Sequence, residues 1–234
     1  MRSWLRVDAV AGKLPRWQSE GVFTVRLTGK DQVHIVSAAA GPLGGDEVAV
    51  QVHVGAGASL TVRGVAASVA LPGLAADRSS WSWELDVAEG GTLVLEPQPV
   101  IVAGRAAHHG TTLLRLAAGS SAVLVEQAQI GRFGESSGTW RGSLAVDVDG
   151  RELVRHTVEL GEGSATWDRF FAPAAIESEF RYPDDRPASV AAPDGARPKP
   201  AGAPGGVESA WGARLSLAGG GSLTTRLSAR LVDM

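Results

Sequence analysis

Apolar and polar residues alternate along several stretches of this chain. Valines at positions 48, 50, 52 and 54 are separated by Ala49, Gln51 and His53, and residues 81–87 and 140–148 repeat the pattern. Successive side chains of a strand point to opposite faces, so each stretch is predicted to bury one face and expose the other. Asp149-Gly150 suits a tight type I′ turn into a strand over 151–160. These runs predict antiparallel hairpins.

A weak repeat places a glycine between one apolar run and the next. The first three copies carry Gly57, Gly90 and Gly119, roughly 30 residues apart, as expected for units that bury their faces by stacking. Each glycine provides the positive φ of a tight turn between strands. Both a jelly roll and a solenoid-like winding of two stacked sheets satisfy this pattern. The copies span residues 54–62, 87–95, 116–124 and 217–223, with a truncated copy at 160–165.

The predicted fold class is all-β, with two stacked, mostly antiparallel layers, solenoid-like winding and one or two short helices. The best helix candidate is 172–180, where Pro173 suits a first turn. Residues 183–206 are rich in proline, alanine and glycine and predict a flexible insertion. We therefore expect a single domain, with a main β body over 1–182 and a C-terminal hairpin over 207–234 that returns to it.

Composition excludes several classes of function. The chain has 234 residues and no cysteine, which excludes disulfides, thiolate metal sites and cysteine nucleophiles. A net charge of −3 with scattered arginines provides no basic surface for nucleic acid. The sequence contains neither a secretory signal nor an apolar run of about 18 residues. We expect a soluble cytoplasmic protein that binds neither nucleic acid nor a membrane.

Two prolines interrupt the apolar run over residues 94–101. Proline donates no ladder hydrogen bond, so Pro97 and Pro99 cannot lie in a central strand. Gln98 between them carries two donors and an acceptor, and Glu96 precedes them. The segment predicts an edge strand or a kinked connection that presents polar groups from a rigid backbone.

Catalytic and metal-binding patterns are sparse. The adjacent His108 and His109 would point to opposite faces of a strand, so an exposed turn is favoured over a shared metal. The sequence has no Gly-x-Ser-x-Gly elbow and no complete phosphate-binding loop. An acid/base pair would require two carboxylates in one cleft, and solvated strand faces are favoured for them. The carboxylates considered are Glu84, Glu96, Glu126 and Glu135.

Glycine-rich loops with charged residues stand before one strand and after another. Asp46 follows two glycines, and Arg132 and Glu135 flank Gly134. Glycine permits close backbone approach, and charge-assisted hydrogen bonds can lock such loops.

Taken in order, these segments resemble the UreD family of urease accessory proteins, also called UreH. Spacing and order fit over roughly residues 40–160. The matching elements are Gly44-Gly45-Asp46, residues 54–60, residues 93–101, Glu126 with Gly131-Arg132 and Gly134-Glu135, and residues 149–153.

The resemblance implies a non-enzymatic scaffold or chaperone with two stacked β-layers. It implies cytoplasmic assembly with UreF and the GTPase UreG on apo-urease, a homodimer formed through the UreF complex, and assistance in nickel insertion. No cofactor is tightly bound on this view, and nickel is handled transiently along a polar internal route. Weak oxygen ligands suit an ion that must enter and leave. The candidate route residues are Asp46, Glu96, Gln98, Glu126 and Glu135, with His108 and His109 as weaker candidates.

The chain departs from the family pattern in two places. Val65 and Val69 stand where the family segment has glutamine and lysine, so a less polar lining is expected there. The chain ends at Met234, where family members commonly continue into a segment that contacts UreF, so altered UreF binding is expected.

Two other functions fit the residues. One is a carbohydrate-active β-sandwich or β-solenoid using carboxylates with Trp81, Trp83 and Trp140, although alternation places Trp81 and Trp83 on the inward face. The other is a structural module without a metal role.

Overall fold

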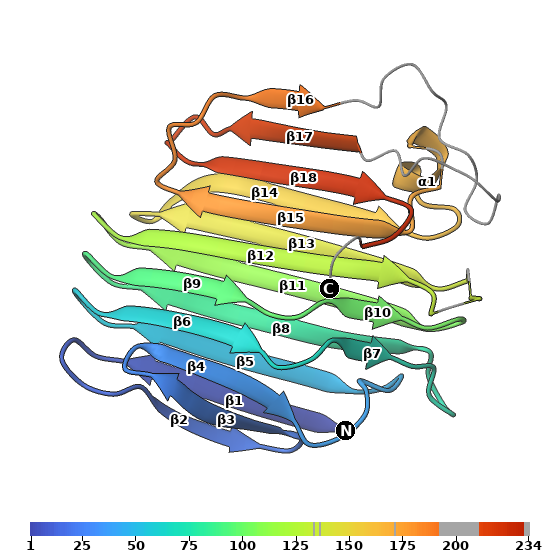
Figure 1. Ribbon diagram of the computed structural model, residues 1–234, viewed down its shortest axis with the longest axis horizontal. Coiled ribbons are helices and arrows are strands. Elements are labelled where there is room, and N and C mark those ends of the chain that lie inside the picture. The colour runs from blue at the N-terminus through green and yellow to red at the C-terminus, as the bar shows by residue number, and fades with distance from the viewer. Residues whose placement is uncertain (133, 136, 171, 192–210, 232–234) are drawn as a thin grey trace.

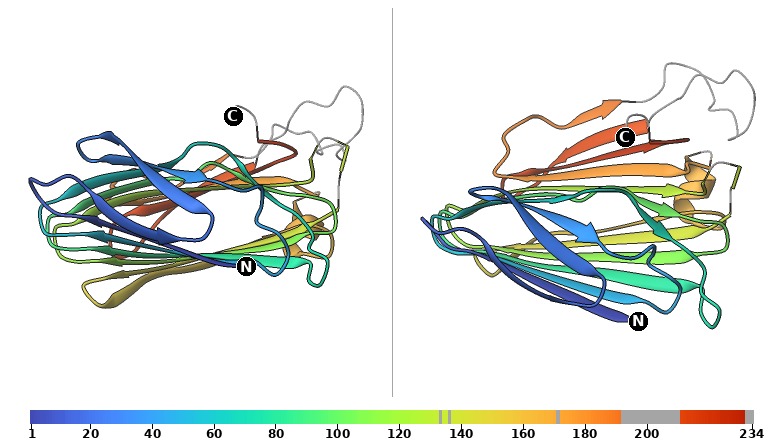
Figure 2. Two further views of the ribbon diagram at one scale, coloured as in Figure 1. Left: turned by 90° about the horizontal axis from the view of Figure 1, so that it is seen from below. Right: turned by 60° about the horizontal axis from the view of Figure 1, so that its bottom comes forward.

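The computed structural model of the chain describes residues 1–132, 134–135, 137–170, 172–191 and 211–231. Two β-sheets stack face to face, and the chain winds from one to the other as it advances from β1 and β2 at the bottom of Figure 1 to β16 and β17 at the top (Figures 1 and 2). The predicted all-β, two-layer fold with solenoid-like winding is therefore confirmed.

The first layer is a sheet of seven strands. Its strands, in spatial order, are β14 (Arg151–Leu160), β13 (Thr139–Val148), β11 (Ala107–Leu116), β8 (Arg78–Val87), β5 (Glu47–Val54), β1 (Arg2–Ala9) and β2 (Arg16–Glu20).

The second layer is a sheet of eleven strands. Its main path is β16 (Ser189–Ala191), β17 (Trp211–Ser216), β18 (Ser222–Ser228), β15 (Ala175–Tyr182), β12 (Ser121–Ile130), β9 (Thr92–Glu96), β6 (Ser59–Gly64), β4 (Gln32–Ser37) and β3 (Phe23–Gly29). The short strands β10 (Val100–Val102) and β7 (Ser68–Ala70) extend it beside β12.

The repeated glycines form the turns that pass the chain between layers. Gly57, Gly90 and Gly119 have φ of 62°, 64° and 67°, a conformation that glycine adopts without steric cost. They connect β5 to β6, β8 to β9 and β11 to β12. The Gly57 amide donates to the Glu89 carbonyl at 3.0 Å, so successive turns are bonded to one another.

The expectation of mostly antiparallel pairing is wrong for the middle of each sheet. The strands β1, β5, β8, β11 and β13 pair in parallel, as do β4, β6, β9 and β12. Each glycine turn sends the chain into the other layer. Neighbouring strands within a layer therefore come from successive rounds of the winding and run in one direction. Antiparallel pairs lie toward the ends, including β13 with β14 around Asp149 and Gly150. Both turn residues have positive φ, as predicted.

The helix expected over 172–180 is absent, and β15 occupies Ala175–Tyr182 instead. This strand pairs along its length with β12 on one side and β18 on the other, and Phe180 is buried between the layers. Sheet pairing therefore overrides the helix propensity of the segment. Within the described residues, the helix is α1 (Ala165–Arg169), whose first turn is capped by the Ser164 hydroxyl.

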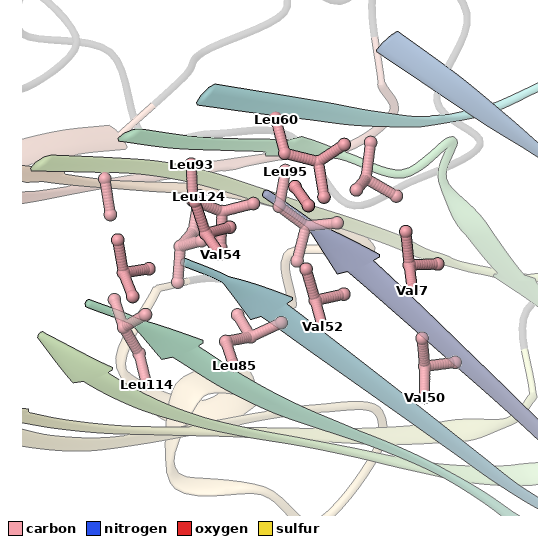
Figure 3. Packing of buried hydrophobic residues seen from close by; sticks show 14 of the residues in the cluster. Val7, Val50, Val52, Val54, Leu60, Leu85, Leu93, Leu95, Leu114 and Leu124 are labelled. Carbon is pink, nitrogen blue, oxygen red and sulfur yellow. The ribbon is translucent and has the colours of Figure 1, made fainter. Parts of the chain in front are cut away.

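Valines and leucines of both layers form the main core. Figure 3 shows side chains of β1, β5, β8 and β11 facing Leu60, Leu93, Leu95 and Leu124 of the other sheet. Trp81 and Trp83 pack inward against this core, as alternation predicted. Interdigitated apolar side chains hold the two sheets together through the hydrophobic effect.

The expected insertion over 183–206 lies partly outside the described residues, which omit 192–210. Its first part contains β16, which pairs with β17. β17 and β18 form an antiparallel hairpin at one side of the eleven-stranded sheet. Across the described part of the chain, no helix has the length and apolar character needed to span a membrane.

Candidate functional site

The prolines of segment 97–99 break the eleven-stranded sheet beside β12. β9 pairs with β12 over residues 121–124, whereas β10 pairs with it over 128–130. Residues 125–127 of β12 therefore have no ladder partner on that side. The predicted kinked connection is confirmed. It lies inside the sheet, at a gap in the ladder where no backbone N–H donor is required, so proline is tolerated there.

The preceding segment of the same sheet, which runs from β6 to β7, is interrupted at the same level. β6 ends at Gly64 and β7 begins at Ser68, with residues 65–67 between them. A Cβ on Gly64 would lie 2.8 Å from the backbone nitrogen of Gln98, so only glycine lets the two interruptions pack this closely. The two interruptions together open the sheet.

A cavity of about 470 Å³ lies between the layers at this break. Its wall is mainly apolar, with the aromatic rings of Phe23, Trp81, Trp83 and Trp140. Gln98, His108 and Glu126 bring polar groups to it. The cavity reaches the surface beside exposed lining residues, namely Ser37, Ala39, Ala40, Val65 and Ala66.

Glu126 projects from β12 across the cavity toward two glycines of the opposite sheet. A Cβ on Gly110 would lie 3.0 Å from Oε1, and one on Gly142 would lie 3.0 Å from Oε2. The glycines thus leave the space that the carboxyl group occupies. Among the described residues, nothing forms a hydrogen bond or ion pair with it, and burial raises its pKa to about 7. Its side chain lines the cavity.

His108 lines the same cavity as a neutral base. Its Nδ1 is 2.9 Å from the Ser79 hydroxyl, and the residue is 1 % exposed. Burial, followed by the charge of His109, lowers its pKa to about 4. His109 extends from the other face of β11, where burial and then Arg78 and Arg141 lower its pKa. The exposed turn expected for this pair is therefore wrong, because both histidines lie in the strand β11 and point to opposite faces. The two histidines do not share a ligand, and in the described ranges no three His, Asp or Glu side chains are placed to hold one metal ion.

We predict that Ser79→Ala destabilises the fold by about 1–2 kcal/mol, because it leaves the buried imidazole without its hydrogen-bond partner. Urea denaturation at pH 7 measures this change. Ser82→Ala is the matched control, since that hydroxyl lies on the exposed face of the same strand and bonds a backbone carbonyl. Equal losses for the two variants would contradict the role assigned to Ser79.

Asp46 and Glu135 lock loops away from this cavity. Asp46 accepts from the N-terminal ammonium at 2.6 Å and from the Leu43 amide at 2.9 Å. Burial alone would raise the pKa of Asp46, but these two partners outweigh it and hold the pKa below its ordinary value. Arg132, followed by backbone amides of Gly104 and Arg132, lowers the pKa of Glu135 to about 2. Both carboxylates are thus occupied by structural partners.

Glu96 lies outside the cavity. Leu93 and Leu95 of β9 point inward, so Glu96 faces outward, where it pairs with Arg63 at 2.8 Å. Of the predicted route residues, the structure gathers Gln98, Glu126 and His108 around one cavity and places Asp46, Glu96, Glu135 and His109 elsewhere.

Sequence reasoning missed the two glycines beneath Glu126. Gly142 interrupts the predicted strand 140–148, and Gly110 directly follows the histidine pair. An isolated glycine within a strand often marks the close approach of another group, and that signal was available.

The model of the family described as UreD urease accessory protein matches residues 16–179. The chain belongs to the UreD family. The matched region contains the break, the cavity residues Gln98, His108 and Glu126, and the loop carboxylates Asp46 and Glu135.

Curated UreD relatives agree with this assignment. Urease accessory protein UreD 1 of Saccharopolyspora erythraea is 35 % identical over 202 residues, covering 86 % of this chain and 73 % of the relative. Urease accessory protein UreD of Frankia alni is 46 % identical over 118 residues, covering 50 % and 40 %. That of Streptomyces avermitilis is 36 % identical over 160 residues, covering 66 % and 64 %. The chain thus spans between 40 % and 73 % of these UreD proteins.

Proposed function

We propose that this chain is a non-enzymatic scaffold for urease maturation in the cytoplasm. It assembles with UreF and the GTPase UreG on apo-urease and assists nickel insertion. Membership of the UreD family carries this proposal, since its named relatives are urease accessory proteins. The two-layer body supports it by presenting broad sheet faces on which partners can assemble.

The internal cavity is the proposed path of the nickel cargo. Glu126 supplies a carboxyl group that has no partner among the described residues, Gln98 adds an amide, and His108 remains a neutral base at neutral pH. Nickel accepts such oxygen and nitrogen ligands, and a sparse set of them holds an ion weakly. Weak binding suits an ion that must enter and leave the cavity.

We predict that the tagged chain retains both UreF and UreG when the three proteins are mixed with GTP and nickel. Pull-down followed by quantitative gel analysis measures the retention. An unrelated all-β protein with the same tag is the control and retains neither. If the folded chain also recovers neither partner under these conditions, the scaffold role does not hold for it.

A further inference from the structure

Aromatic side chains line the cavity that contains the Glu126 carboxyl group. A Cβ on Gly142 would overlap the Trp140 ring and lie 3.0 Å from Glu126 Oε2, so ring and carboxylate lie side by side above this glycine. Trp81 is the register neighbour of Gly110, the other glycine beneath the carboxyl group. The Trp140 ring therefore lies beside the carboxyl group, and Trp81 extends from the strand next to Gly110.

Further rings continue this wall. Trp81 and Trp83 are stacked, with centroids 5.8 Å apart and planes inclined by 11°. Phe23 reaches Trp81 from the edge of the other layer, with centroids 5.0 Å apart. All three rings line the cavity that contains Glu126. The site thus combines one negative group with several π-systems.

This combination selects the chemistry of a ligand. A carboxylate without a partner in an apolar site is unfavourable, and either a proton or a bound cation removes the cost. Aromatic faces attract cations that are poorly hydrated, of which alkylammonium ions are the main biological class. A small inorganic ion would use the carboxylate and leave the rings and most of the volume unused. The volume of about 470 Å³ falls within the usual range for small-molecule sites.

We propose that this cavity binds a small organic cation of the alkylammonium class, with its charge on Glu126 and its alkyl groups against Trp81, Trp83 and Trp140. The ligand enters beside Val65 and Ala66, where the lining reaches the surface. A bound organic cation would occupy the carboxyl group proposed to handle nickel, so the two would compete. The binding site itself does not depend on the role in urease maturation.

The test is calorimetric titration of the isolated chain at pH 8 with n-butylammonium and tetramethylammonium chloride. n-Butanol, which has the same alkyl chain without the charge, and sodium chloride serve as comparison ligands. We expect saturable binding of the ammonium ions that is at least 10-fold tighter than that of n-butanol. Glu126→Gln should weaken ammonium binding by at least 10-fold, and Trp83→Leu by several-fold. Glu96→Gln, on the outer face, should leave it unchanged.

Three outcomes would overturn the proposal. They are absence of ammonium binding to the folded wild-type chain, equal affinity for n-butanol, and unchanged ammonium affinity in Glu126→Gln. Urea denaturation of each variant establishes that it is folded before titration. Retention of UreF and UreG is measured separately, so loss of the ammonium site and loss of the scaffold role remain distinguishable.

Discussion

Replacing Glu126 by glutamine is expected to stabilise the folded chain by about 3 kcal/mol at pH 8. The pKa of this carboxyl group rises from 4.5 to about 7 on folding, because burial disfavours its charged form. Between these two values the unfolded chain has released its proton while the folded chain retains it. Stability therefore falls as pH rises from 4.5 to 7 and stays low above pH 7. Glutamine has nearly the same shape and carries no charge, so it avoids this loss.

Urea denaturation of both proteins at pH 4 and pH 8 measures the effect. The gain should be near its full size at pH 8 and small at pH 4, where the carboxyl group is protonated in both states. Glu96→Gln is the matched control, since it removes an exposed ion pair worth at most about 1 kcal/mol. A Glu126→Gln variant no more stable than wild type at pH 8 would show that the carboxylate has a partner in solution.

Substituting Gly44 by alanine is expected to destabilise the fold by about 3 kcal/mol or more. A Cβ at this position would overlap the Ala76 carbonyl oxygen and lie 2.6 Å from the Gly73 amide nitrogen. Both neighbours are backbone atoms, so no side-chain rotation relieves the overlap. The affected turn also positions Asp46, which accepts from the N-terminal ammonium.

Gly57→Ala separates this overlap from the ordinary cost of losing a glycine. Gly57 has φ of 62°, and a Cβ there would meet nothing within 4 Å. Its replacement should cost only about 1–2 kcal/mol through backbone conformation. Thermal and urea unfolding of the two variants measure the difference. Similar losses at both positions would contradict the close backbone contact at Gly44.

The alternation of side chains was sufficient to predict the strands but not their directions. Valines at 48–54 and the run 81–87 identify the inward faces of β5 and β8, and Gly57 and Gly90 identify the turns after them. A turn glycine shows that the chain changes direction without showing whether it returns within one sheet or crosses to another. The central strands are parallel only because strands from successive rounds of the winding pair with one another.

The candidate site was predictable in part. Pro97 and Pro99 predicted a break. Because side chains alternate along a strand, inward-facing Leu93 and Leu95 were sufficient to place Glu96 on the outer face of the sheet. The meeting of that break with Glu126 depends on the register of β9 and β10 against β12, which joins residues about 30 apart and leaves no local signal. The helix expected over 172–180 failed for the same reason, since two long-range ladders decide the conformation of β15.

The break and the buried carboxyl group together form the site at which we propose that this β body binds a cation. Proline forbids a ladder bond at the break, glycines of the opposite sheet leave space for Glu126, and aromatic rings line the same cavity. The proposed nickel path and the proposed organic-cation site use this same arrangement. Competition between the two ligands would connect nickel delivery to the supply of amines.

The proposed role of this chain is to support nickel insertion into urease. It is tested most directly by the nickel content of urease purified from cells that contain the urease subunits, UreF and UreG, with this chain as the sole UreD protein. We expect nickel-loaded, active urease when the chain is present and nickel-poor, inactive urease when its gene is deleted. Equal nickel content and activity in the two preparations would contradict it.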